Sequence, residues 1–328
     1  MKKTILFITL LLFGATLISC KKDDRIQIGI LQLISHGALD KAREGFIAAL
    51  EENGYSDGDN ITITVLNPQG EATTMQTQAA KLVRQSDLIL AIATPAAIAV
   101  QSELKSQGKN TPLLFTAVTD PVDAKLLDDM ENPGGNITGT SDLNPINKQI
   151  DLIKELLPEA TTLGILYNAS EPNSEIQANL AEEYASSIDL IVKRKTVTNA
   201  TEIKTVLSSL ITQENVDVIY TPTDNLLASN MGVLEETILS LSSHHVPIIA
   251  GERDNVYQGA SLTYSINYYT LGHLTGLMAK AILEGEKPGS ISVATIEDVE
   301  LIINKKQLDK LNIPIPEELL TKADEIIE

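Results

Sequence analysis

The chain has 328 residues, 43% of them apolar, which is enough for two domains with substantial hydrophobic cores. It carries 44 Asp and Glu against 25 Lys and Arg, a net charge of −19. An acidic chain without a basic patch repels nucleic acid, so this composition excludes a nucleic-acid-binding function.

The amino terminus has the features of an export signal. Two lysines precede an apolar run over residues 5–18, which is too short to span a bilayer comfortably. Cys20 is the only cysteine and sits where a bacterial lipobox places its cysteine. We therefore predict a signal peptide over 1–19, lipidation at Cys20 and a lipid-anchored leader over 20–25. The alternative is a plain cleaved signal, or a short anchor that contains a cysteine by chance.

The first part of the chain alternates between predicted strands and helices. In the stretch 87–97, an apolar run ends at Thr94-Pro95 and is followed by an alanine-rich segment. Such a run suits a parallel strand covered on both faces, and Thr followed by Pro is typical of a helix start. Open α/β sheets hold ligands at these strand-to-helix junctions. Strands are predicted at 25–33, 61–66, 88–94 and 113–118, and helices at 39–50, 72–83 and from 95 to about 104.

A turn at 131–135 interrupts this alternation, and we interpret the β-prone piece at 136–140 as a first crossing to a second lobe. A second crossing is expected near 266–267, and a turn at 285–289 is suited to begin a third. Between and after these points the alternation resumes. Strands are predicted at 163–167, 190–197, 217–221, 246–250, 260–265 and 299–303, and helices at 145–157, 175–186, 201–210, 226–241, 268–283 and around 316–327.

Three sequence signals recur in one order at nearly one offset, which indicates two similar lobes. The pairs are 28–31 with 163–166, the run from Pro112 with the run from Pro247, both at an offset of 135, and Thr94-Pro95 with Thr221-Pro222, at an offset of 127. The predicted fold class is therefore α/β, with two doubly wound parallel-sheet lobes, joined by crossover strands and separated by a ligand cleft. Lobe 1 is assigned to 26–141 and 267–290, and lobe 2 to 142–266 and 291–328.

Several short motifs point to a known family. They are IATPAA at 92–97, VTDPV at 118–122, NITG at 136–139 with Ser141-Asp142, GILYN at 164–168 with Ser170-Glu171, Thr223-Asp224-Asn225, and Leu271-Gly272 after Tyr268. Together they resemble the ABC-transporter substrate-binding family that includes the TrpX-like tryptophan and tyrosine binders. The likeness runs from about 28 to 315. One departure is Gly37, which stands after the histidine of the first loop where the family pattern leads us to expect a proline.

The resemblance implies a type I periplasmic-binding-protein fold and the capture of a small solute, often an amino acid, between closing lobes. The implied partners are the solute and the permease subunits of an ABC importer, and we expect a monomer, without cofactor, held to the membrane by its lipid. The implied location is extracytoplasmic, on the periplasmic side or at the cell surface. The absence of tryptophan, on which sugars often stack, favours an amino acid over a sugar, and the resemblance favours an aromatic one.

An amino-acid zwitterion needs N–H groups and hydroxyls for its carboxylate and a buried carboxylate for its ammonium. Thr94 and Ser170 are the hydroxyl candidates at predicted helix starts, and Asp120, Asp142 and Asp224 are the acidic candidates. Each could instead be an ordinary helix cap or turn residue. The full candidate set is Gln32, His36, Thr94, Pro95, Asp120, Ser141, Asp142, Asn168, Ser170, Glu171, Asn173, Asp224, Asn225 and Tyr268.

The sequence leaves two alternative functions to consider. An extracytoplasmic enzyme on the same fold is disfavoured, because the chain has no Gly-x-Ser-x-Gly elbow, phosphate loop, Gly-x-Gly-x-x-Gly or Cys-His pair. A receptor that feeds a sensor rather than a permease is indistinguishable from an importer subunit by sequence. No metal site is expected, because the adjacent His244 and His245 point apart and His273 has no partner one turn away.

Overall fold

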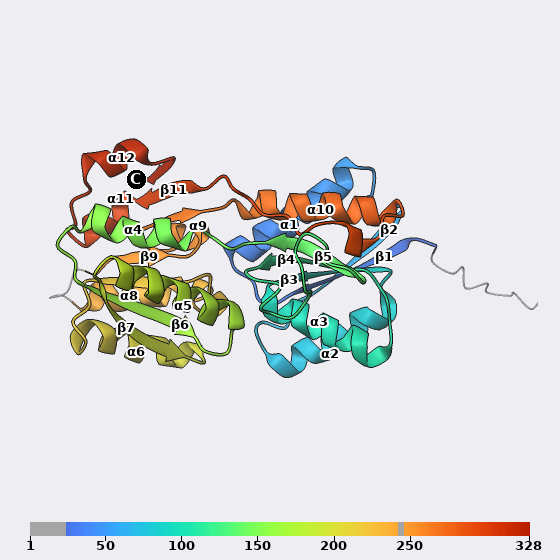
Figure 1. Ribbon diagram of the computed structural model, residues 1–328, viewed down its shortest axis with the longest axis horizontal. Coiled ribbons are helices and arrows are strands. Elements are labelled where there is room, and N and C mark those ends of the chain that lie inside the picture. The colour runs from blue at the N-terminus through green and yellow to red at the C-terminus, as the bar shows by residue number, and fades with distance from the viewer. Residues whose placement is uncertain (1–23, 242–245) are drawn as a thin grey trace, which may run out of the picture.

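Two mainly parallel sheets, each with its own hydrophobic core, lie side by side in the computed structural model (Figure 1). The structure describes residues 24–241 and 246–328. The predicted signal peptide, Cys20, and the pair His244 and His245 lie outside the described residues. The two sheets confirm the predicted α/β class with two lobes.

Lobe 1 is built on a five-stranded, all-parallel sheet with the strand order β2-β1-β3-β4-β5. Its central strands β3 and β4 are buried along their whole length, as predicted for strands covered on both faces. Helix α3 begins at Thr94 with Pro95 in its first turn, so the predicted helix start is confirmed. The elements are β1 (Ile26–Gln32), α1 (Gly37–Glu52), β2 (Ile61–Leu66), α2 (Ala72–Gln85), β3 (Leu88–Ile92), α3 (Thr94–Gln107), β4 (Leu113–Val118), β5 (Ile137–Ser141) and α10 (Tyr268–Leu283).

Lobe 2 is built on a seven-stranded sheet with the order β12-β11-β10-β9-β8-β6-β7, in which the β10–β11 pair is antiparallel. Its elements are α4 (Ile146–Leu156), β6 (Thr162–Asn168), α5 (Pro172–Ser187), β7 (Ile191–Val197), α6 (Ala200–Thr212), β8 (Val218–Thr221), α7 (Asn225–Ala228), α8 (Met231–Ser240), β9 (Ile248–Ala250), α9 (Arg253–Tyr257), β10 (Leu262–Ser265), β11 (Glu300–Asn304), α11 (Lys305–Lys310), α12 (Glu317–Lys322) and β12 (Glu325–Ile327).

The structure differs from the prediction at four places in lobe 2. The helix expected over 226–241 is divided into α7 and α8, because Ser229 and Asn230 end the first helix and the Asn230 amide bonds the carbonyl of Leu226. The tail expected to be helical forms α12 followed by strand β12. The short helices α9 and α11 were not predicted, because five or six residues are too few for a clear helical periodicity.

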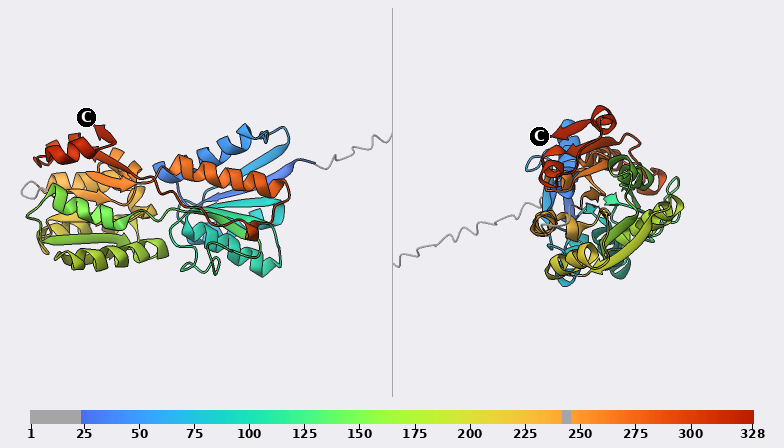
Figure 2. Two further views of the ribbon diagram at one scale, coloured as in Figure 1. Left: turned by 45° about the horizontal axis from the view of Figure 1, so that its top comes forward. Right: turned by 90° about the vertical axis from the view of Figure 1, so that its left-hand side faces the viewer.

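The chain passes between the lobes three times (Figure 2). The piece at 136–140 forms most of β5, which pairs with β4 at the edge of the lobe 1 sheet, so the first crossing follows this strand instead of coinciding with it. The second crossing lies between β10 and α10. After the short 3-10 turn η1 (Pro288–Ser290), the chain runs along β5, where Ala294 pairs with Thr140, and then enters lobe 2 at β11.

Helix α10 is anchored in lobe 1 by an unusually close contact with α1. A Cβ atom on Gly272 would lie 1.8 Å from the carbonyl oxygen of Ala42, and a Cβ on Gly45 would lie 2.0 Å from the carbonyl oxygen of Tyr269. Both positions therefore require glycine for the helix backbones to approach. This contact fixes the start of α10, and with it Tyr268, at the boundary between the lobes.

Candidate functional site

A small cavity, here called the central cavity, lies between the two lobes. It measures about 10 Å³, which is the space one water-sized group occupies. Its polar residues follow the carboxyl ends of strands, the place predicted for a ligand in this fold class. Lobe 1 contributes His36, Leu39 and Ala117, lobe 2 contributes Asn173, Thr223, Asp224, Asn225 and Glu252, and Asp142 and Tyr268 stand at the crossings.

Two acids of lobe 2 organise the helix starts around this cavity. Asp224 caps α7 by accepting from the N–H of Leu227 at 2.9 Å, and it also accepts from the N–H of Asn168 at 2.5 Å. Glu171 accepts from the N–H groups of Asn225 and Leu226, both at 3.2 Å. Burial, followed by the negative charge of Glu171, raises the pKa of Asp224 to about 7. These carboxyl groups stabilise the start of α7 through the helix dipole.

His36 reaches across the cleft from lobe 1 to lobe 2. Its Nε2 lies 3.1 Å from Asn225 Oδ1, and its Nδ1 lies 3.6 Å from Oε1 of Glu252. The second distance is within the range of an ion pair but too long for a hydrogen bond. Burial lowers the pKa of His36 and raises that of Glu252, whose pKa is raised further by neighbouring acids. The pair therefore favours its uncharged forms in this closed arrangement.

A second link between the lobes runs through one hydroxyl group. Thr119 of lobe 1 donates to Asp142 Oδ1 at 3.0 Å and accepts from Gln177 Nε2 of lobe 2 at 3.0 Å. The other oxygen of Asp142 accepts from the Tyr268 hydroxyl at 2.8 Å. Burial raises the pKa of Asp142, and it also raises that of Tyr268. Asp142 therefore has both oxygens satisfied by protein donors.

A larger pocket of about 420 Å³, here called the cleft pocket, adjoins the central cavity and shares Asn225 with it. Both lobes line it, and several predicted residues do so: Pro95, Asn168, Ser170, Glu171 and Asn225. Apolar side chains provide much of the remaining wall, namely Leu33, Ile34, Met75 and Leu226. The combination of an apolar wall with a few convergent polar groups is typical of a small-molecule site.

Four predicted residues line neither of these spaces. Gln32 is bonded within lobe 1 to the Ile34 carbonyl and to Asp40. Asp120 accepts from the N–H groups of Val122 and Asp123, which is the turn-capping role considered as its alternative. The other two are Ser141 and Thr94.

Ser141 lies at the end of β5, and its hydroxyl donates to the carbonyl of Thr119 at 2.8 Å. Thr94 is 2% exposed, and within the described part of the chain its hydroxyl has no hydrogen-bond partner. It is the first residue of α3, whose N-cap is Ala93 with a positive φ of 84°. In contrast to that of Ser141, the Thr94 hydroxyl is therefore unpaired among the described residues.

The second Thr-Pro pair does not repeat the first. At Thr221-Pro222 the strand β8 ends, but the following helix α7 begins only at Asn225, with Asp224 as its cap. The helix predicted from residue 226 thus begins one residue earlier, after the second pair and not at it. The reason is local, because the N–H of Asp224 bonds the carbonyl of Pro222 in a tight turn before the helix.

The prediction omitted Glu252, Thr223 and Gln177. The internal repeat could have identified Glu252, because it lies 135 residues after Ala117, at the same offset that relates the two lobes. Thr223 was named as part of a motif but not as a site residue. Gln177 lies inside a helix, where the sequence carries no signal that its amide faces the other lobe.

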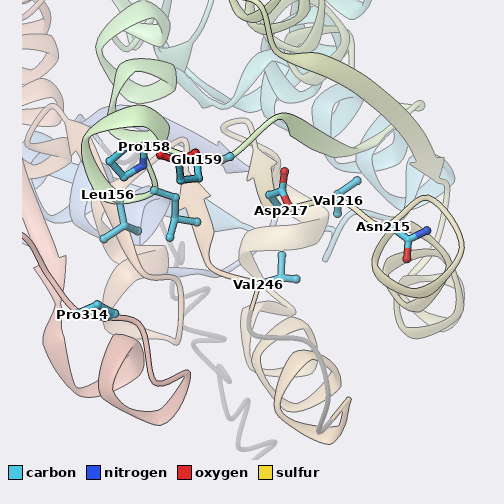
Figure 3. Close-up of a pocket in the computed structure, with 10 residues that line it drawn as sticks. Leu156, Pro158, Glu159, Asn215, Val216, Asp217, Val246 and Pro314 are labelled. Carbon is cyan, nitrogen blue, oxygen red and sulfur yellow. The ribbon is translucent and has the colours of Figure 1, made fainter.

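Another pocket, of about 650 Å³, lies at the opposite end of the lobe 2 strands (Figure 3). Its residues Pro158, Asn215 and Val246 precede strands β6, β8 and β9 and thus lie at the amino ends of the sheet. Of its two acids, Asp217 is already bonded by the N–H groups of Thr161 and Thr162, and Glu159 is exposed. In contrast to the central cavity, this pocket therefore has no buried polar side-chain atom that lacks a partner among the described residues.

The described residues include no group of three or more His, Cys, Asp or Glu side chains arranged to hold a metal ion. No helix among them is long and apolar enough to cross a membrane.

Comparison with known proteins places the chain. The family described as ABC transporter substrate binding protein matches residues 27–327. The tyrosine-binding protein of Clostridioides difficile (strain R20291) is 42% identical over 296 residues, which are 89% of this chain and 83% of that protein.

Two solved structures are also similar. One is the ABC domain in complex with L-Trp from Streptococcus pneumonia, with 35% identity, a TM-score of 0.86, and coverage of 92% of this chain and 100% of that one. The other is the ligand-free, open structure of a substrate-binding protein with adhesive properties from Clostridium difficile, with 40% identity, a TM-score of 0.68, and coverage of 92% and 99%. The lobes here are thus arranged more like those of the L-Trp complex, although the sequence is closer to the open protein.

These matches confirm the resemblance drawn from the motifs and the type I periplasmic-binding-protein fold. The family and its structural neighbours are solute-binding proteins and not enzymes. The chain belongs to the ABC transporter substrate-binding protein family.

Proposed function

We propose that the protein is the extracytoplasmic, lipid-anchored substrate-binding subunit of an ABC importer and that it captures an aromatic amino acid between its lobes. The observation that carries this proposal is the pairing of a buried, acid-lined cavity with an adjoining apolar pocket, both formed by the two lobes together. A relative is named for tyrosine binding and a structural neighbour holds L-Trp, which supports an aromatic ligand. The lipid would be attached at Cys20.

The cavity would hold the amino group and the cleft pocket the aromatic ring. Leu33, Met75 and Leu226 give the ring an apolar wall. Pro95, Asn168 and Ser170 would complete its surroundings. Because the two spaces share Asn225, a single amino acid would extend from one into the other. The central cavity holds only one small group, so the lobes would have to separate before the whole ligand can enter.

The ligand carboxylate would be received at the start of α3. This helix has no side-chain cap, and its first residue carries the buried Thr94 hydroxyl, which has no partner within the described residues. Helix α5 of lobe 2, which contacts α3 across the cleft, also begins without a side-chain cap. Uncapped helix amino termini attract anions. Closure would therefore bring two such termini toward one carboxylate.

A thermal-shift panel on residues 21–328, with the common amino acids and simple sugars as ligands, tests the proposal. A ligand at a thousandfold its dissociation constant stabilises the protein by roughly 4 kcal/mol. The melting temperature should therefore rise by several degrees with tryptophan or tyrosine. A shift only with other solutes would retain the receptor and reject the aromatic ligand. No shift with any solute, in protein freed of carried-over ligand, would contradict the proposed site.

A further inference from the structure

We infer that Glu252, Asn173 and His36 form an ammonium-binding subsite in the central cavity. Each contributes one buried hydrogen-bond acceptor without a protein donor, and all three line the same water-sized space. The inference deepens the proposed function and rests on it, because it requires the ligand to carry a primary ammonium group. It also assigns the recognition of that group mainly to lobe 2.

The orientation of the Asn173 amide is fixed by its neighbour. Its Nδ2 donates to the carbonyl of Thr223 at 2.8 Å, so its Oδ1 points away from that carbonyl. The side chain is 4% exposed, and Oδ1 has no donor within the described part of the chain. This oxygen is therefore a free acceptor at the cavity wall.

The hydrogen bonds around His36 determine which of its nitrogens carries the proton. The Asn225 amide donates through Nδ2 to the carboxylate of Glu171, which leaves its Oδ1 facing His36 Nε2. Nε2 must therefore be the N–H donor. Burial lowers the pKa of His36, so the imidazole is neutral and Nδ1 presents a lone pair. No donor among the described residues reaches this nitrogen.

Glu252 provides the third acceptor. It is 2% exposed, and its Oε1 lacks a donor among the residues the structure describes. The adjacent Arg253 does not neutralise it, because this guanidinium is bonded to Glu300 and Glu325. The titratable groups that face Glu252 or act on it are His36, Asp142, Asp224, Asp254 and Tyr268.

Three acceptors and no donor are the complement of an ammonium group, which has three N–H donors and no acceptor. A water molecule has only two donors and would leave one acceptor unsatisfied. The other two acids of the cavity do not compete for this role, because both oxygens of Asp142 and of Asp224 already accept from protein donors. Glu252 is therefore the carboxyl group left to pair with a ligand cation.

The proton balance of this step is simple. In the ligand-free form, burial and the neighbouring acids raise the pKa of Glu252 and so favour its protonated form, and its Oε1 lies 3.6 Å from His36 Nδ1 without a hydrogen bond to it. When the ligand ammonium enters, that proton leaves to solvent, and the carboxylate and the imidazole nitrogen accept from the ammonium instead. The ammonium group thus takes the place of the proton that Glu252 releases, and the ligand keeps all its protons.

The test is a cycle of two ligands and several variants, with dissociation constants measured by calorimetry on residues 21–328. L-tryptophan is compared with indole-3-propionate, which has the same ring and carboxylate but no amino group. In the wild-type protein we expect a preference for tryptophan of roughly 10- to 100-fold, the range for a hydrogen bond to a charged group. Glu252→Gln should remove most of this preference by weakening tryptophan alone. Asn173→Ala, a second variant, should reduce it by roughly 3- to 10-fold.

Glu159→Gln is the control, because it makes the same change at an exposed glutamate of lobe 2, in the pocket at the opposite end of the sheet. It should leave the affinity for both ligands, and so the preference, in place. Equal weakening of both ligands by Glu252→Gln, with a native melting transition, would overturn the subsite. So would an equal loss of the preference in Glu159→Gln and in Glu252→Gln.

The outcomes also separate this subsite from the proposed function. If the protein binds no aromatic amino acid but binds another amine-bearing solute in a Glu252-dependent way, the aromatic ligand is wrong and the subsite stands. If tryptophan binds without dependence on Glu252, the proposed function stands and the subsite is wrong. If the protein binds only solutes without an amino group, both are wrong.

Discussion

Ala117 in lobe 1 and Glu252 in lobe 2 occupy matched places, 135 residues apart, and both line the central cavity. Ala117 lies within β4, near its end, with a positive φ of 55° and a methyl side chain, whereas Glu252 follows β9 and carries a buried carboxyl group. The two lobes thus repeat a fold without repeating its chemistry. The acids Glu171, Asp224 and Glu252 all belong to lobe 2.

This difference indicates a division of roles between the lobes. Lobe 2 holds the acidic groups and the network that orients them, so it would recognise the ammonium group of a ligand even with the lobes apart. Lobe 1 contributes neutral groups, chiefly His36, the Thr119 hydroxyl and the small side chain of Ala117, which complete the site on closure. The stability of lobe 1 depends instead on close backbone contact between its helices.

The largest effect that tests this comparison is on folding. Gly272→Ala would place a Cβ 1.8 Å from the carbonyl oxygen of Ala42 and force α10 away from α1. We expect a loss of about 3 kcal/mol or more in the free energy of unfolding, measured with urea. Gly232→Ala, in helix α8 of lobe 2, is the matched control because its Cβ meets nothing within 4 Å. It should stabilise by about 0.5 kcal/mol or more. Similar effects of the two changes would contradict the close-contact role.

A second effect should arise from the acids of lobe 2. Burial and Glu171 raise the pKa of Asp224 from 3.8 to about 7, so between these values the folded protein holds a proton that the unfolded chain releases. This contribution to stability is complete below pH 4 and is lost as the pH rises toward 7. The difference corresponds to on the order of 4 kcal/mol.

Asp224→Asn should remove this pH dependence. We therefore expect the melting temperature of the ligand-free wild-type protein to fall relative to that of the variant as the pH is raised from 4 to 7. The comparison between the two proteins cancels the pH dependence of the carboxyl groups that do not interact with Asp224. If the melting temperatures of the two proteins instead changed in parallel across this range, Asp224 would have its ordinary pKa, and its burial would cost no folding stability.

The sequence predicted local features well where one short segment determines them. Thr94-Pro95 stands at the start of α3, although the same pair at Thr221-Pro222 does not start a helix, and the apolar run before Thr94 forms a buried strand. The matched offsets indicated two lobes, because each lobe repeats the same order of strands and helices. Several candidates from strand ends, such as His36, Asp142 and Asp224, do line the central cavity.

The sequence could not show which polar groups are already satisfied. Asp120, Asp224 and Glu252 all follow predicted strands, yet the first caps a turn, the second caps a helix, and the third has an oxygen without a donor among the described residues. The two caps are formed by N–H groups two or three residues further along the chain, but the second oxygen of Asp224 is bonded by Asn168, 56 residues away. The free oxygen of Glu252 depends on the absence of a donor among the described residues, which no local pattern shows. Contacts across the cleft, such as that of Gln177, depend on the closed arrangement of the lobes and have no local signature.

The smallest effect tests the closing role of lobe 1. Thr119→Val keeps the shape of the side chain but removes the hydroxyl that accepts from Gln177 and donates to Asp142. In the closed form these two groups lose a partner, whereas in the open form water can replace it. Closure should become less favourable by about 1 kcal/mol. The dissociation constant for the bound amino acid should therefore rise about fivefold. Thr119→Ser, which keeps the hydroxyl, should bind nearly as the wild type does. Equal affinities for the valine and serine variants would mean that this bridge does not hold the lobes together and that closure depends on His36 and the ligand alone.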